Sequence, residues 1–90
     1  DGMFLSNDIL ATQCLAYALS QGYRIPDDIR IMGYDGIYIT SLVYPALTTV
    51  QQNFTKLAEC AVDTAINLIE GKETPKEILI PVELIERKTT

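Results

Sequence analysis

The sequence predicts an α/β fold in which parallel strands alternate with helices. Three short apolar runs have the length and composition of buried strands, at residues 2–6, 29–33 and 47–50. The segment between the first two runs is long enough to hold a helix. A crossover of that kind is right-handed and makes the two flanking strands parallel.

The first expected strand, residues 2–6 (GMFLS), leads directly into a helix. Asn7 and Asp8 carry side-chain oxygens that can accept hydrogen bonds from the first free N–H groups of that helix. The run from Ile9 to Leu19 is apolar almost all round, which predicts a helix that is covered on more than one side. Gly22 provides the left-handed residue that commonly ends a helix.

The second expected strand, Ile29–Gly33, follows a turn at residues 26–28 and leads into Tyr34 and Asp35. An acid just after a buried strand lies where open α/β sheets bind ligands, beyond the carboxyl ends of the strands. The alternative is an ordinary turn, because Asp35 is followed by Gly36 and Asp-Gly is a common turn sequence.

The rest of the chain predicts one more helix and two more strands. Residues 37–44 fit either a short helix or a loop on the sheet edge, and residues 47–50 are the third strand. Asn53 caps a helix whose apolar face runs from Phe54 to Ile69. Residues 78–85 are the last strand, in which Pro81 predicts an edge position or a break because it lacks an N–H donor. We expect the closing Arg-Lys-Thr-Thr to be a polar tail.

The composition argues against several classes of function. The chain has 90 residues, a net charge of −5 and seven scattered basic residues, which argues against direct binding of nucleic acid by this segment. The lack of histidine and of a cysteine pair excludes a structural zinc site, and we expect no cofactor. No nucleophile and base can be paired without histidine, and no glycine-rich phosphate loop is present, so we expect no enzyme.

The cysteines and the apolar runs indicate the compartment. Cys14 and Cys60 each lie among apolar helical neighbours, where a buried free thiol is expected, which favours the reducing cytoplasm. No apolar run approaches the ~18–20 residues that a bilayer span needs, and the chain opens without a basic leader. We therefore expect no membrane partner.

Polar and aromatic side chains follow the strands at one edge of the expected sheet. Asn7 follows the first strand, Tyr34 and Asp35 follow the second, and Gln52 and Phe54 follow the third. Amide and carboxylate groups can bind the hydroxyls of a polyol, and an aromatic ring can cover the apolar side of a sugar. Helix capping is the alternative role for Asn7. By position alone, Gln52 would be a surface residue and Phe54 a core residue.

Four separated motifs give the chain a resemblance to a known family. They are SNDILATQ, GYDG, PALTTVQQ and the closing ERKTT, in this order and with plausible spacings. The chain thereby resembles the C-terminal part of the effector-binding core of LacI/GalR-family transcriptional repressors. That resemblance implies a fragment of a periplasmic-binding-protein-like type I fold. A periplasmic sugar-binding protein of a transport system is the alternative, because it would share the first motifs.

The resemblance also implies the roles of particular residues. Asn7, Asp35 and Gln52 would contact a sugar or a related small effector, and Tyr34 and Phe54 would line the cleft. Asp8 would mainly start the helix that follows it. No residue is assigned to catalysis or to a metal.

The family's core has two subdomains, which the chain would enter in turn. Residues 1–50 and 81–90 would belong to the C-terminal subdomain, and residues 51–80 to the N-terminal one. Closure on an effector would bias a homodimer between two states of different operator affinity. Residues 9–19 and 37–44 are the candidates for the dimer interface. Operator DNA would be bound through a helix-turn-helix that is absent from this chain.

Overall fold

The computed structural model describes all residues from 1 to 90 and divides them into two compact units. Unit 1 comprises Asp1–Gln52 and Glu83–Thr90, and unit 2 comprises Asn53–Val82. The chain therefore leaves unit 1 after Gln52 and returns to it at Glu83. None of its helices is long and apolar enough to cross a bilayer.

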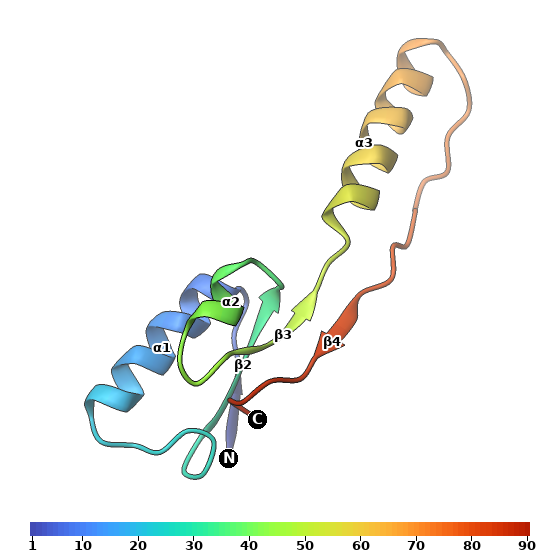
Figure 1. Cartoon of the computed structure of the whole chain (residues 1–90). Helices are drawn as coiled ribbons and strands as arrows, with labels where there is room; N and C mark the ends of the chain where they lie inside the picture. Colours follow the sequence, from blue (N-terminus) through green and yellow to red (C-terminus); the bar gives the residue numbers. More distant parts are fainter. The chain divides into compact units, whose positions relative to one another are not determined.

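Unit 1 is built on a four-stranded sheet in the order β1-β2-β3-β4 (Figure 1). The strands are β1 (Gly2–Phe4), β2 (Arg30–Asp35), β3 (Thr48–Gln51) and β4 (Glu83–Ile85). The first three strands run parallel, and β4 pairs antiparallel with β3 at the edge of the sheet. The predicted α/β class with parallel strands alternating with helices is confirmed, with β4 as the one antiparallel strand.

Two helices of unit 1 lie close together (Figure 1), and the core forms between the longer one and the sheet. Helix α1 (Asp8–Ser20) connects β1 to β2 and packs on β2, whereas α2 (Ile39–Leu42) is a single turn. The buried apolar side chains are Ala11, Leu15 and Ala18 of α1, Ile31 of β2, and Leu47. The open question over residues 37–44 is thus answered by a short helix.

The cap that was expected for α1 is present. Asn7 is the N-cap, and its Oδ1 accepts a hydrogen bond from the Leu10 N–H at 2.8 Å. Gly22 adopts the left-handed conformation, with φ of 86°, just after the helix. Although α1 is apolar almost all round, much of that apolar surface is exposed in this chain, Ile9 and Tyr17 included.

The end of the chain is not the polar tail that the sequence suggested. Thr89 is fully buried, donates from Oγ1 to the Ile31 carbonyl at 2.6 Å, and accepts from the Thr48 N–H at 2.9 Å. Arg87 donates from Nη1 to Thr40 Oγ1 at 2.7 Å, which ties the tail to α2. The prediction was wrong because polar side chains can be buried once every polar group finds a partner.

Unit 2 contains helix α3 (Phe54–Ile69), whose predicted bounds are confirmed. Its N-cap is Asn53, which accepts from the Lys56 N–H at 3.0 Å. No residue of α3 is buried, so its apolar face is exposed in this chain. The predicted last strand is shorter than expected and begins only at Glu83, because Pro81 interrupts the extended segment before it.

Candidate functional site

The carboxyl edge of the sheet in unit 1 brings Asp35 and Gln52 together. The Gln52 side-chain amide donates from Nε2 to Asp35 Oδ1 at 2.7 Å, and the Gln52 N–H donates to the Asp35 carbonyl at 2.9 Å. The pairing follows from the parallel register, in which Asp35 lies opposite Gln51. Carboxylate and amide therefore form one polar pair at the end of two adjacent strands, where α/β sheets bind ligands.

Asp35 has an unusual backbone conformation. Its φ of 118° is positive, and residues other than glycine rarely adopt such values because the Cβ crowds the backbone. Conformations of this kind cost of order 1–3 kcal/mol and persist only where the surroundings hold them, commonly at functional sites. The next residue, Gly36, also has a positive φ, of 81°. Apart from the Asp-Gly pair itself, nothing in the sequence pattern predicts this backbone conformation.

Asp8 lies beneath this edge and does more than start α1. It is fully buried, and its Oδ2 accepts from the Gly36 N–H at 2.7 Å and the Ile37 N–H at 2.8 Å. Its Oδ1 accepts from the Thr49 hydroxyl at 2.6 Å. Sequence reasoning missed this role because all three donors lie 28 or more positions away along the chain.

The other predicted contacts are less concentrated. Asn7 uses Oδ1 for the helix cap, so its amide N–H groups are what it can offer to a ligand. Tyr34 is half-buried, and its ring meets that of Phe4 with centroids 6.4 Å apart and planes at 60°. Phe54 opens α3 in unit 2 with a half-exposed side chain, and its place in the cleft stays a prediction.

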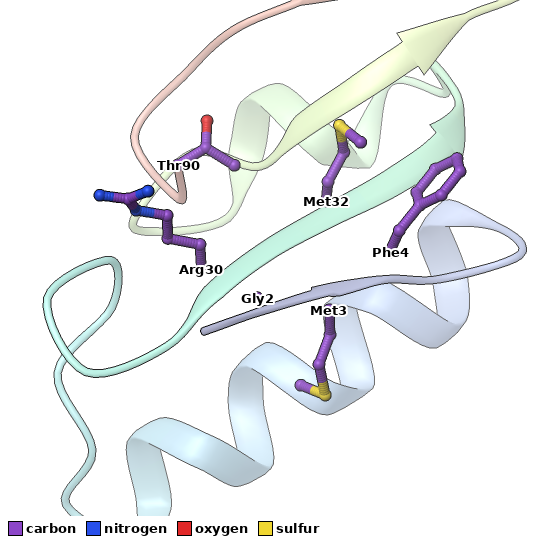
Figure 2. A pocket seen from close by; sticks show the side chains of 6 residues that line it. All are labelled: Gly2, Met3, Phe4, Arg30, Met32 and Thr90. Carbon is purple, nitrogen blue, oxygen red and sulfur yellow. The ribbon is translucent and has the colours of Figure 1, made fainter.

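A shallow hollow of about 230 Å³ lies along β1 and β2 (Figure 2). None of the predicted effector residues lines it, and its polar groups come from Arg30 and Thr90. The lining residues are Gly2, Met3, Phe4, Arg30, Met32 and Thr90. The hollow is therefore separate from the Asp35–Gln52 pair.

A second hollow, of about 210 Å³, lies between α1 and the segment that follows α2. It is lined by Thr12, Leu15, Ala16, Leu19, Val43 and Tyr44. The Thr12 hydroxyl is buried there without a hydrogen-bond partner, and the Tyr44 ring beside it is 93% exposed. Apolar and aromatic side chains therefore gather on this surface.

Comparison with protein families and curated relatives gives consistent matches along the whole chain. A family model described as a periplasmic binding protein-like domain matches residues 1–90. The sucrose operon repressor of Streptococcus mutans is 36% identical over 94% of the chain and 27% of its own length. The ribose operon repressor of Halalkalibacterium halodurans is 38% identical over 100% of the chain and 28% of its own length. The lactose operon repressor of Escherichia coli is 35% identical over 98% of the chain and 24% of its own length.

Solved structures match equally well. A periplasmic binding protein/LacI transcriptional regulator from Alkaliphilus metalliredigens, complexed with D-xylulofuranose, has a TM-score of 0.91 and 37% identity, covering 100% of this chain and 34% of that one. A lac repressor dimer bound to operator and the anti-inducer ONPF has a TM-score of 0.91 and 35% identity, covering 99% of this chain and 31% of that one. The chain thus spans about a quarter of the curated relatives and about a third of the matched structures.

Proposed function

The chain belongs to the periplasmic binding protein-like domain family in the form that LacI-type transcriptional regulators contain, and from this premise we propose that it is the effector-binding and dimerisation portion of such a regulator. The single observation that supports it most is the Asp35–Gln52 pair at the carboxyl edge of the sheet. The transport-protein alternative has less support, because the curated relatives named above are operon repressors.

The proposed effector is a sugar or a related polyhydroxylated molecule. The Asp35 carboxylate can accept from vicinal hydroxyls, while the amide groups of Gln52 and Asn7 can donate to them. Tyr34 and Phe54 would cover the apolar side of the ring. A matched regulator structure contains D-xylulofuranose, which is a ligand of this chemical class.

Effector binding would act on the arrangement of two subdomains. We assign residues 1–50 and 81–90 to the C-terminal subdomain and residues 51–80 to the N-terminal one. The chain passes between the two compact units after Gln52 and before Glu83, so these two passages are where a hinge would bend. An effector that binds one arrangement better than the other shifts the population toward it.

We assign dimerisation to the surface formed by residues 9–19 and 37–44. This surface carries exposed Leu42, Tyr38 and Tyr44 beside the hollow that contains the unpartnered Thr12 hydroxyl. Exposed apolar patches of this kind are typical of interfaces between protein chains. Operator DNA would be bound by a helix-turn-helix outside this segment, because the segment itself carries a net charge of −5. We place the regulator in the cytoplasm, where operator DNA lies.

The test is calorimetric titration of the full-length protein with a panel of sugars and sugar phosphates, repeated with Asp35→Ala. We expect the substitution to weaken effector binding by about tenfold or more, since it removes a charged group that accepts hydrogen bonds from the effector's hydroxyls. Operator binding without effector should be kept. Unchanged affinity in the variant would show that the effector does not bind at this edge, and a protein that ignores the whole panel would rule out a sugar effector.

A further inference from the structure

The buried carboxylate of Asp8 makes none of the effector contacts assigned above, and we propose that it is a positioning residue that holds the carboxyl edge in its binding geometry. The inference rests on the proposed function, because that edge is taken to bind the effector. Burial of a carboxylate is costly unless its oxygens are well hydrogen-bonded. Asp8 is fully buried as the first residue of α1, so hydrogen bonds from the surrounding structure must offset the free energy of desolvation.

The first stabilising hydrogen bonds to Asp8 come from the backbone directly after Asp35. The consecutive N–H groups of Gly36 and Ile37 both point at Asp8 Oδ2, at 2.7 and 2.8 Å. Hydrogen bonds to an ionised acceptor are roughly twice as strong as neutral ones. Asp35, with its positive φ, is thus held from both sides: by Gln52 at its own carbonyl and side chain, and by Asp8 through the next two amides.

A further hydrogen bond to Asp8 comes from the neighbouring strand. The Thr49 hydroxyl in β3 donates to Asp8 Oδ1, and Thr49 is only three residues before Gln52. Asp8 therefore connects the start of α1 to the segment directly after Asp35, which ends β2, and to β3, which leads into Gln52. The α1 N-terminus also favours a negative charge there, because the unpaired N–H groups of the first turn give it a partial positive charge.

Gly33 gives an independent sign that the sheet accommodates this carboxylate. Gly33 lies opposite Thr49 in the register of β2 and β3. A Cβ added at Gly33 would overlap Asp8 Oδ1 and lie 3.2 Å from Asp8 Cα. The missing side chain thus lets the first turn of α1 lie directly on the sheet, where the carboxylate reaches both partners.

The test uses the full-length protein and two readouts: effector affinity by calorimetry with the same sugar panel, and hydrogen exchange of the Gly36 and Ile37 amides. We expect Asp8→Ala to weaken binding by about tenfold or more and to speed exchange of these two amides. Asp8→Asn keeps the shape and one acceptor oxygen but loses the charge and the second acceptor, so its effector affinity and its amide exchange should lie between those of Asp8→Ala and of the wild-type protein. Asp28→Ala is the control, because it removes a carboxylate that also accepts a backbone N–H, from Arg24 at 2.8 Å, in the turn before β2.

Asp28→Ala should leave the affinity unchanged. If Asp8→Ala does not fold, Thr49→Val replaces it, since the valine keeps the shape but loses one donor, and Thr49→Ser is its conservative partner. Suppose that Asp35→Ala weakens effector binding but Asp8→Ala or Thr49→Val keeps the wild-type affinity. That result would overturn the positioning role of Asp8 alone. Equal losses in Asp8→Ala and Asp28→Ala would also overturn it, by showing a general loss of stability. Unchanged binding in Asp35→Ala would instead overturn the proposed function and this inference with it.

Discussion

At the scale of single residues, two hydrogen bonds join Asp35 to Gln52 at the carboxyl edge of the sheet. Asp35 was singled out because it closely follows an apolar run, whereas Gln52 was taken for a surface residue by position and was assigned to the effector only by the family resemblance. The sequence could not predict the strained φ of Asp35 or the buried contacts of Asp8, because both depend on residues brought together only by the fold. A strand end can be read from local pattern, whereas a tertiary hydrogen bond cannot.

Gly36 offers a sharp test at this scale. A Cβ at this position would lie 2.6–2.8 Å from atoms of Gln51, and the backbone φ is 81°. Gly36→Ala should therefore lower the free energy of unfolding by more than the roughly 1 kcal/mol that a positive φ alone costs an alanine. It should also weaken effector binding, because it displaces the segment next to Asp35. Thermal unfolding and titration of the full-length protein measure the two effects.

Gly22 is the matched control for that substitution. It has a similar φ of 86°, but a Cβ there would meet nothing within 4 Å. Gly22→Ala should therefore show only the backbone cost and keep the effector affinity. If the two variants lose equal stability and bind equally well, close packing against Gln51 is not what requires glycine at position 36.

At the scale of elements, the strength of the local pattern decided what could be predicted. Helix α3 was predicted at its observed bounds because a long apolar period and the Asn53 cap agree. Residues 37–44 stayed open because a one-turn helix is too short to show a period. The start of β4 was placed too early, because the apolar residues on both sides of Pro81 have the composition of one strand, but the edge position or break expected at Pro81 agrees with a strand that begins at Glu83 and pairs only with β3.

The surface on α1 and α2 carries the prediction at this scale. Leu42 of α2 is 63% exposed, and Leu42→Glu would place a charge in the proposed dimer interface. Because desolvating an unpaired charge is costly, the full-length protein should shift from dimer to monomer in sedimentation velocity. Leu79→Glu is the control, since Leu79 is 84% exposed but lies outside this surface. A Leu42→Glu protein that stays dimeric would place the interface elsewhere.

At the scale of the whole molecule, the class of fold could be predicted but the division into units only in outline. The parallel strands of unit 1 follow from alternating strands and helices, and the matched structures share that fold. The assignment of residues 51–80 to a second subdomain came from family resemblance and remains a proposal. Local pattern could not give it, because α3 shows the same amphipathic period whichever partner covers it.

The antiparallel pairing of β3 with β4 makes the second unit removable by design. Gln51 lies opposite Glu83, so the chain leaves and re-enters unit 1 at neighbouring points. Replacing residues 53–81 with Asn-Gly would join Gln52 to Val82 through a two-residue hairpin of the type that suits antiparallel strands. We expect the shortened protein to keep slow exchange at the Gly36 and Ile37 amides, measured by NMR. Unit 2 would then be an insertion in a hairpin, and the fold of unit 1 would not depend on it.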